Sequence, residues 1–483
     1  MEKRQHPINI VENMGKLIFL LLIPVLRGLL SYSGGGITAW ITGAWLDIVI
    51  VGTILSVAVI RWLSGTYRIT GSGIAFQKGV LIRREISVDF DRISTLTAES
   101  LFYYKLFRAV RVRADTDGGG RRSSDIRMTL READAEQLLA LNEKSRQSEE
   151  SFIKRVYKPK GLYIAAVSAV LSNSFAGVLL ASTFISNLGS ILGEEFKNRI
   201  YGTVAYIARL LAFGLSPAAA ALGYAIMGGW LVAFISNLIR HKNFTAVRSQ
   251  NILQISGGLF TTRRYSVTVE NINYLDICQS VSTKILRLYT VFMQAAGYGK
   301  SKNDMSLLVP AAGYKELTKT LKLLVPEYSL KPRSVYPRFR SIMRFLTFPL
   351  VLMVLLWASA RIFLLLLPSW KDLILFSAVM IFLLLAWFLA LRLTNFFTTG
   401  ISFDKSFVIL RYSKGYYLHT ALIPHHKISR IEIRQTILQR WGNTCDVVLY
   451  SYSEGKNVHR VKSVDRKQAL TLMGLLEKAD TVK

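Results

Sequence analysis

The sequence contains few cysteines and few acidic residues. Its 483 residues include two cysteines, Cys278 and Cys445, and 31 Asp and Glu against 61 Lys and Arg. Two cysteines so far apart provide neither a disulfide framework nor a zinc cluster, so we expect both to be buried free thiols. The formal charge of +30 indicates an anionic partner. Apolar runs make a membrane surface a better candidate than nucleic acid.

Motifs of catalysis and cofactor binding are missing as well. The "GKS" at residues 299–301 is preceded by Gln294 where a phosphate-binding loop has its first glycine, and it lies between two expected strands. His425 and His426 form the one histidine cluster, and neither a carboxylate nor a cysteine stands beside them at metal-ligand spacing. The sequence therefore predicts no catalytic residue, no cofactor, no metal site and no nucleic-acid partner.

Long apolar runs, by contrast, are abundant, and hydrophobic residues make up 51% of the chain. A helix needs about 20 apolar residues to cross roughly 30 Å of hydrocarbon. Six windows qualify: residues 16–32, 45–63, parts of 161–183 and 217–239, 345–367 and 373–393. The first window resembles a signal peptide, but Arg27 interrupts it and no small-residue cleavage site follows, so an uncleaved helix fits better. The apolar stretch 201–214 is an additional interfacial or spanning candidate.

These windows form three pairs, and a strand-rich segment follows each pair. Basic residues flank the pairs on the outside, whereas the loops inside the first and third pairs have little charge. The flanking basic residues are Lys154, Arg155, Lys158, Lys160, Lys331, Arg333, Arg338, Arg340 and Arg344. By the positive-inside bias, we expect the N-terminus and all three strand-rich segments to be cytoplasmic.

The three strand-rich segments repeat one another. We align the copies on one isoleucine in each, which we call the anchor. In every copy a valine stands nineteen residues after the anchor, and a turn glycine stands 13 or 14 residues before it. The anchors are Ile93, Ile272 and Ile428, the valines Val112, Val291 and Val447, and the glycines Gly79, Gly258 and Gly415. Each copy ends in an amphipathic helical pattern, at residues 131–145, 311–324 and 465–479.

We therefore expect membrane α-helical hairpins that alternate with small β-sandwiches, each with a C-terminal capping helix. The predicted hairpins cover residues 1–63, 151–240 and 331–394, and the predicted sandwiches cover residues 64–150, 241–330 and 395–483.

Two stretches carry a resemblance to a known family. These are "QSVSTKILRLYTV" at 279–291 and "QTILQRWGNTCDV" at 435–447, which resemble bacterial pleckstrin-homology-like (PH-like) domains. The first copy has Glu99 and Ser100 in place of the Gln-Ser pair. The whole layout is similar to the YdbT-type membrane proteins. The resemblance implies a seven-stranded sandwich with a capping helix, a bacterial plasma membrane, no known catalysis, and a shorter one-domain membrane relative as partner.

Two groups of arginines are candidate functional residues. Arg83 and Arg84, like Arg263 and Arg264, are strand neighbours, so only one of each pair faces a given side. Two interpretations of these arginines are open. The resemblance to eukaryotic PH domains suggests that they bind a lipid headgroup. Alternatively they form a solvated basic face near anionic lipid, where each basic residue contributes roughly 1 kcal/mol of attraction. The copy near residues 418–419 lacks the pair.

Arg27 and Arg361 fall inside apolar windows and are candidate intramembrane polar residues. They either reach a headgroup or make a polar contact inside the helix bundle.

Together these features favour a non-enzymatic multispanning membrane protein that acts as a scaffold or as a subunit of an envelope-associated complex. The alternative is transport or lipid handling gated by the PH-like domains. Pro24 and Pro349 lie in matching helices and keep that alternative open.

Overall fold

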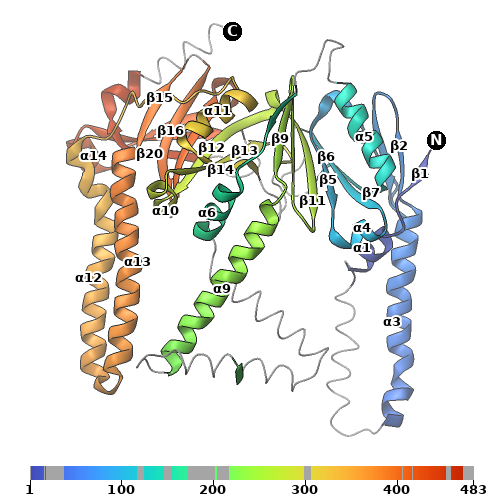
Figure 1. Cartoon of the computed structure of the whole chain (residues 1–483), viewed down its shortest axis with the longest axis horizontal. Coiled ribbons are helices and arrows are strands. Elements are labelled where there is room, and N and C mark those ends of the chain that lie inside the picture. The colour runs from blue at the N-terminus through green and yellow to red at the C-terminus, as the bar shows by residue number, and fades with distance from the viewer. Residues whose placement is uncertain are drawn as a thin grey trace.

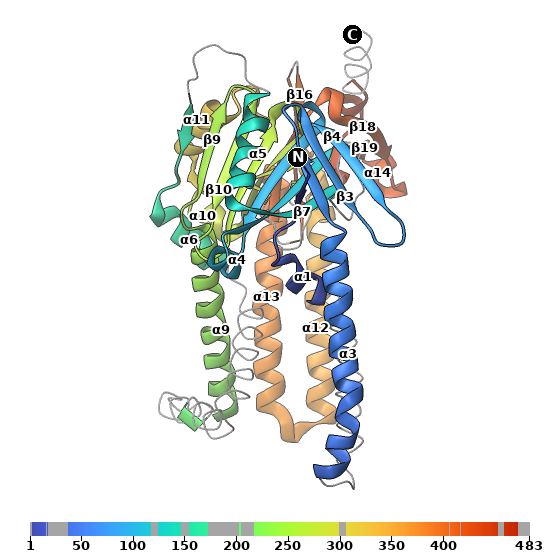
Figure 2. The same cartoon turned by 90° about the vertical axis from the view of Figure 1, so that its right-hand side faces the viewer.

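The computed structural model describes residues 2–15, 17, 37–116, 124–145, 154–171, 202–203, 217–298, 306–404, 406–415, 417–452 and 458–471. Three β-sandwiches lie side by side, and long helices extend from one side of them (Figures 1 and 2).

Each sandwich has two antiparallel three-stranded sheets, with a one-turn helix in the second. Sandwich 1 comprises β2 (Thr66–Ile69), β3 (Gly73–Lys78) and β4 (Arg84–Asp89), then β5 (Ile93–Ser100), α4 (Phe102–Leu106), β6 (Ala109–Thr116), β7 (Ile126–Arg131) and α5 (Glu132–Lys144). Sandwich 2 comprises β9 (Thr245–Ser249), β10 (Ile252–Gly257) and β11 (Thr262–Thr268), then β12 (Ile272–Ser280), α10 (Val281–Ile285), β13 (Leu288–Ala295), β14 (Leu307–Gly313) and α11 (Tyr314–Leu324). Sandwich 3 comprises β15 (Gly400–Phe403), β16 (Phe407–Lys414) and β17 (Tyr417–Pro424), then β18 (Ile428–Arg434), α14 (Ile437–Trp441), β19 (Thr444–Ser451) and β20 (Val458–Asp465).

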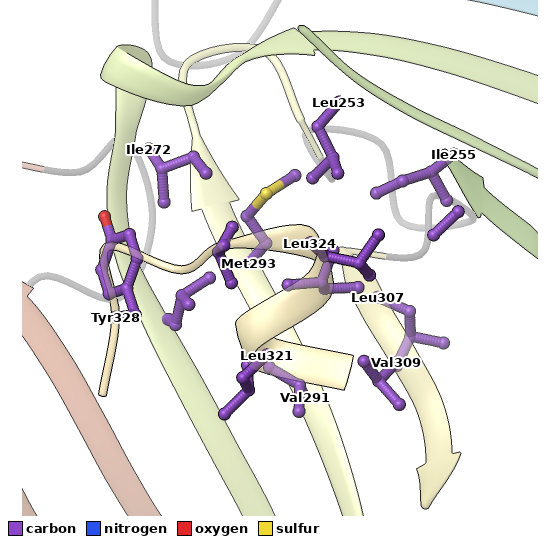
Figure 3. Packing of buried hydrophobic residues seen from close by; sticks show 14 of the residues in the cluster. Leu253, Ile255, Ile272, Val291, Met293, Leu307, Val309, Leu321, Leu324 and Tyr328 are labelled. Carbon is purple, nitrogen blue, oxygen red and sulfur yellow. The ribbon is translucent and has the colours of Figure 1, made fainter. Parts of the chain in front are cut away.

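The repeat spacing marks the cores of these sandwiches. Ile93 and Ile272 are each 1% exposed, and Val112 and Val291 are fully buried. The second core is closed by α11, whose Leu321 and Leu324 pack against residues such as Val291, Met293 and Leu307 (Figure 3). A third capping helix begins at residue 466 and is described to residue 471. The sandwich with a capping helix is thus confirmed for the first two copies.

The turn glycines are also confirmed by their backbone conformation. Gly79, Gly258 and Gly415 all have positive φ, at 115°, 103° and 61°. A Cβ on Gly258 would meet the carbonyl oxygen of Thr261 at 2.0 Å, so the turn before β11 requires glycine.

The resemblance implies seven strands in each sandwich, but each predicted sandwich segment supplies only six of them. In the first two copies the seventh comes from before the helices: β1 (Lys3–Arg4) pairs with β2, and β8 (Arg155–Tyr157) pairs with β9. In the third copy a single bridge, between Val335 and Ile401, occupies this place. The chain on the two sides of each helical segment is therefore held together by strand pairing.

Five described helices overlap the predicted windows, namely α3 (Ile37–Leu63), α6 (Gly161–Leu171), α9 (Pro217–His241), α12 (Ile342–Leu366) and α13 (Lys371–Thr398). The short helix α1 (Asn9–Gly15) precedes the first window. Within the described ranges, two segments are long and apolar enough to span a membrane, Phe339–Leu366 and Ser377–Thr398. These form the third predicted hairpin. Nearly all of the window 16–32, including Arg27, and nearly all of 201–214 lie outside the described residues.

The sandwiches are joined edge to edge. A seven-stranded sheet has the order β7-β6-β5-β11-β10-β9-β8, and a six-stranded sheet has the order β14-β13-β12-β17-β16-β15. The second sheet of each sandwich thus continues into the first sheet of the next. We call the β5–β11 contact joint 1 and the β12–β17 contact joint 2.

Candidate functional site: the joints between sandwiches

Joint 1 is held by backbone pairing and by a buried carboxylate. Six residue pairs run from Thr262 opposite Ser100 to Val267 opposite Thr95. Arg263 donates through Nε and Nη2 to Glu99 Oε1, at 3.0 and 2.9 Å. The Glu99 side chain is 8% exposed, so its charge interacts in a medium that screens poorly.

Two further arginines surround Glu99 from β6. Arg111 and Arg113 approach its Oε2 to 3.7 Å, and Arg111 also binds Glu12 of α1. One carboxylate thus holds guanidinium groups from both sandwiches, which fixes their relative position. Thr95 adds a hydrogen bond across the joint, donated to the Ala296 carbonyl at 2.6 Å.

Joint 2 has the same register with different side chains. Its six pairs run from Leu275 opposite Leu422 to Ser280 opposite Tyr417. His419 Nδ1 lies 2.8 Å from Asp276 Oδ2. The hydrophobic core also crosses this joint, because Phe407, Ile409 and Leu422 of sandwich 3 belong to the core of sandwich 2. Joint 2 is therefore held by apolar packing as well as by the contact between His419 and Asp276.

A cationic cleft of about 540 Å³ lies at joint 2. Its cations are Lys284, Lys331, Arg333 and Arg411, and its described lining includes neither Asp nor Glu. Burial, and next the Arg333 guanidinium, lowers the pKa of Lys284. The same causes lower the pKa of Arg411. Crowded cations of this kind favour an anion in the cleft.

The equivalent cleft at joint 1 is less cationic. It measures about 360 Å³ and contains Lys105, Arg108 and Arg264 beside Glu132 and Glu136. These carboxylates compensate the cations, so the second joint is the stronger anion candidate.

The sequence-predicted arginines occupy different places. Arg83, Arg84 and Arg264 are exposed, and Arg83 donates to Gln77 Oε1 at 2.6 Å. The guanidinium of Arg263 is held inside joint 1 by Glu99. The residue that matches it in register is Arg84 rather than Arg83, since both precede their anchor isoleucines by nine residues.

Arg361 is exposed near the end of α12, about 7.5 Å along the axis from Leu366 at 1.5 Å per residue. Its guanidinium lies 5.9 Å from the ring centroid of Trp357. This position is compatible with reaching a headgroup.

The cysteines follow the prediction in part. Neither forms a disulfide, and Cys445 is fully buried, but Cys278 is only partly buried. Cys278 lies at joint 2 directly opposite His419, which the sequence could not indicate. Among the described residues, no group of three or more His, Cys, Asp or Glu could hold a metal ion.

The residue at the position of the glutamine in the Gln-Ser motif makes the same side-chain hydrogen bond in all three copies. Gln279 donates to the Leu288 carbonyl and Gln435 to the Thr444 carbonyl, each at 2.8 Å. Ser100 takes the same position in the first copy and reaches the Ala109 carbonyl at 3.5 Å. The motif thus closes the one-turn helix between the first two strands of the second sheet.

Comparison with known proteins agrees with this architecture. The family model for the bacterial PH domain matches residues 18–145, 201–324 and 345–480, so the chain belongs to the bacterial PH domain family. It is also similar to the UPF0699 transmembrane protein YdbT of Bacillus subtilis (strain 168), with 22% identity over 467 residues that cover 86% of this chain and 90% of that protein. No solved structure matches. The chain is a transmembrane protein with repeated bacterial PH domains.

Proposed function

We propose that this protein is a non-enzymatic membrane scaffold, a subunit of an envelope-associated membrane complex. The observation that carries the proposal is the pair of joints, which make three PH-like domains one continuous unit. Such a unit presents a wide surface in a fixed arrangement, as docking of other proteins requires.

The sandwiches form a platform on the cytoplasmic face of a bacterial plasma membrane. This placement is supported by the basic residues between the units and by strand pairing on both sides of each helical segment, which returns the chain to the same side. The chain then crosses the membrane in three hairpins. Basic side chains orient the platform toward anionic lipid.

The partner is a shorter one-domain membrane relative or another membrane protein. The test is gentle affinity purification of the full chain from native membranes, followed by identification of proteins and lipids by mass spectrometry. The proposal expects a stoichiometric membrane protein, and a variant with joint 1 broken should recover less of it. Recovery of the chain without any stoichiometric membrane protein would contradict the proposal.

The cationic cleft at joint 2 favours one alternative, lipid handling by the PH-like domains. In that case the same purification retains an anionic lipid in place of a protein. Exchange of Lys284 and Arg411 for glutamine then removes the lipid, whereas exchange of the exposed Arg83 leaves it bound.

A further inference from the structure

The two joints follow one register rule. In joint 1, Arg263 lies opposite Glu99. Arg263 stands nine residues before the anchor isoleucine of sandwich 2, and Glu99 stands six residues after the anchor isoleucine of sandwich 1. In joint 2, His419 and Cys278 stand at the same two positions relative to the anchors of sandwiches 3 and 2, and they also lie opposite each other. The remaining pairs of both joints keep the same offset. The family's sandwich thus joins its successor in one defined way.

At each end of the molecule, the strand that corresponds to a joint strand has no neighbouring sandwich to pair with. β4, the counterpart of β11 and β17, ends the sheet β1-β2-β3-β4, and β18, the counterpart of β5 and β12, ends the sheet β18-β19-β20. Neither has a second strand partner among the described residues. Such an edge exposes unpaired backbone N–H and C=O groups and serves as a template for another strand.

Burial shows that β18 lacks the cover that its counterparts have. Seven of the eight residues of β5 are buried, whereas none of the seven residues of β18 is. On β4, Arg84, Glu85, Ser87 and Asp89 are exposed, whereas Ile86 and Val88 are partly buried.

The two free edges also carry charged residues near the position that the rule pairs. When the rule is applied to them, Arg84 falls opposite Arg434, and Glu432 falls two residues away from that position on β18. Asp276 has this same diagonal relation to His419 in joint 2, where the two side chains are in contact. Glu432 already binds Arg434 at 2.7 Å. Its Oε2 accepts from Tyr450 Oη at 3.1 Å and from Nη2 of Arg430 and Arg434 at 3.3 and 3.1 Å. In the joined edge, Arg84 would become a further donor to this carboxylate, which would then bridge the opposed guanidinium groups of Arg84 and Arg434.

The two edges of one chain do not meet. Sandwich 1 and sandwich 3 lie at opposite ends of the molecule (Figure 1). Because the sandwiches all lie on one side of the long helices, two copies in one membrane are related by rotation about the membrane normal. A contact between unlike edges is heterologous and builds a ring or an open row.

We propose that β18 of one copy adds to β4 of a second copy in the register of the internal joints, so that copies of this chain assemble head to tail in the membrane plane. The contact continues the interface that already holds the sandwiches together, and it goes beyond the proposed scaffold role. It needs no other protein.

Cysteine cross-linking in native membranes tests the proposed register. Arg84→Cys and Arg434→Cys are placed on separate chains with different tags, and mild oxidation is applied to membranes that contain both. The expected result is a disulfide between the tags, because both positions are exposed and directly opposed.

The matched control pairs Glu85→Cys with Arg434→Cys, which places the thiols on opposite faces of the joined sheet. Each single variant mixed with the unsubstituted chain controls for the native cysteines. Absence of the 84–434 cross-link, equal cross-linking in the Glu85 control, or a cross-link of Arg434→Cys to a one-domain relative in place of a second copy overturns the proposal.

Charge exchange supplies a second measurement that does not need oxidation. Glu432→Arg should lower the dimeric and larger fraction in lipid nanodiscs about fivefold, as loss of a cross-strand charge pair implies. Adding Arg84→Glu to the same chain should restore that fraction. Equal fractions in all three proteins overturn the proposal.

Discussion

Removal of the Glu99 charge should open joint 1. In Glu99→Gln, the amide keeps one oxygen for Arg263, but the guanidinium groups of Arg263 and Arg113 lose their shared negative partner. These side chains are only 15% and 11% exposed, so water compensates little. Removing one partner of a buried ion pair costs about 3–5 kcal/mol. Because Arg111 keeps Glu12 and Gln keeps a hydrogen bond, we expect about 3 kcal/mol.

That cost corresponds to about a hundredfold increase in the open fraction of the joint. Hydrogen exchange of the full chain in nanodiscs measures it directly, since the amides of β5 and β11 should exchange about a hundredfold faster. The amides of β12 and β17 should not change, because joint 2 has its own contacts. Glu270→Gln is the control, since Glu270 is exposed. Unchanged exchange in β5 and β11 would refute the role given to Glu99.

Four further predictions concern the cores, turns and helices. Burial lowers the pKa of His459 to about 4, so the stability of sandwich 3 is complete above about pH 6.5 and declines as the pH falls toward 4. The loss of unfolding free energy should be about 2 kcal/mol at pH 5. In denaturation experiments His459→Gln should remove this pH dependence, and a pH dependence that persists in the variant would contradict the assignment to His459. Gly258→Ala should cost about 1–3 kcal/mol and more than Gly415→Ala, because a Cβ clashes only at the first position; equal unfolding midpoints would count against the turn argument. Leu321→Ala should cost about 2–5 kcal/mol, because the side chain is 3% exposed in the core of sandwich 2; a loss below 1 kcal/mol, a rough lower limit for a buried leucine, would show that the capping helix is dispensable. Arg361→Leu should leave folding and partner recovery unchanged, as a scaffold tolerates it, whereas a conduit would lose function with the fold intact.

The repeat and its turns could be predicted from the sequence because local physics determines them. Gly79 and Gly258 are required by positive φ. The isoleucine and valine positions repeat because the first two sandwiches bury both of them, and the third buries Val447 and partly buries Ile428. The capping helices follow from their periodicity. The extra strands β1 and β8 could not be predicted, because each pairs with a strand on the far side of a long helical segment.

The joints also connect strands that are far apart in the sequence, but the sequence does contain a signal for them. The strands that enter joints read "ISTLTAES" and "INYLDICQS", with one charged residue each, whereas the free strand reads "ISRIEIR", with alternating charges. A strand buried on both faces has fewer charges than an exposed edge. The sequence marks Arg263 as a candidate, but its partner Glu99 is 164 residues away, so the sequence does not predict the ion pair.

The most direct test of the central claim, that strand joints unite the three domains, is a single substitution at joint 2. His419→Cys places a thiol directly opposite the native Cys278, and paired residues in antiparallel strands lie about 4.5–5.5 Å apart between Cα atoms, within disulfide range. Oxidation of native membranes should yield an intramolecular 278–419 disulfide, found by peptide mapping. Thr420→Cys, whose side chain points to the other face, should not form it. Free thiols at both positions of His419→Cys, under conditions that oxidise exposed cysteine pairs, would show that the strands are not joined in this register.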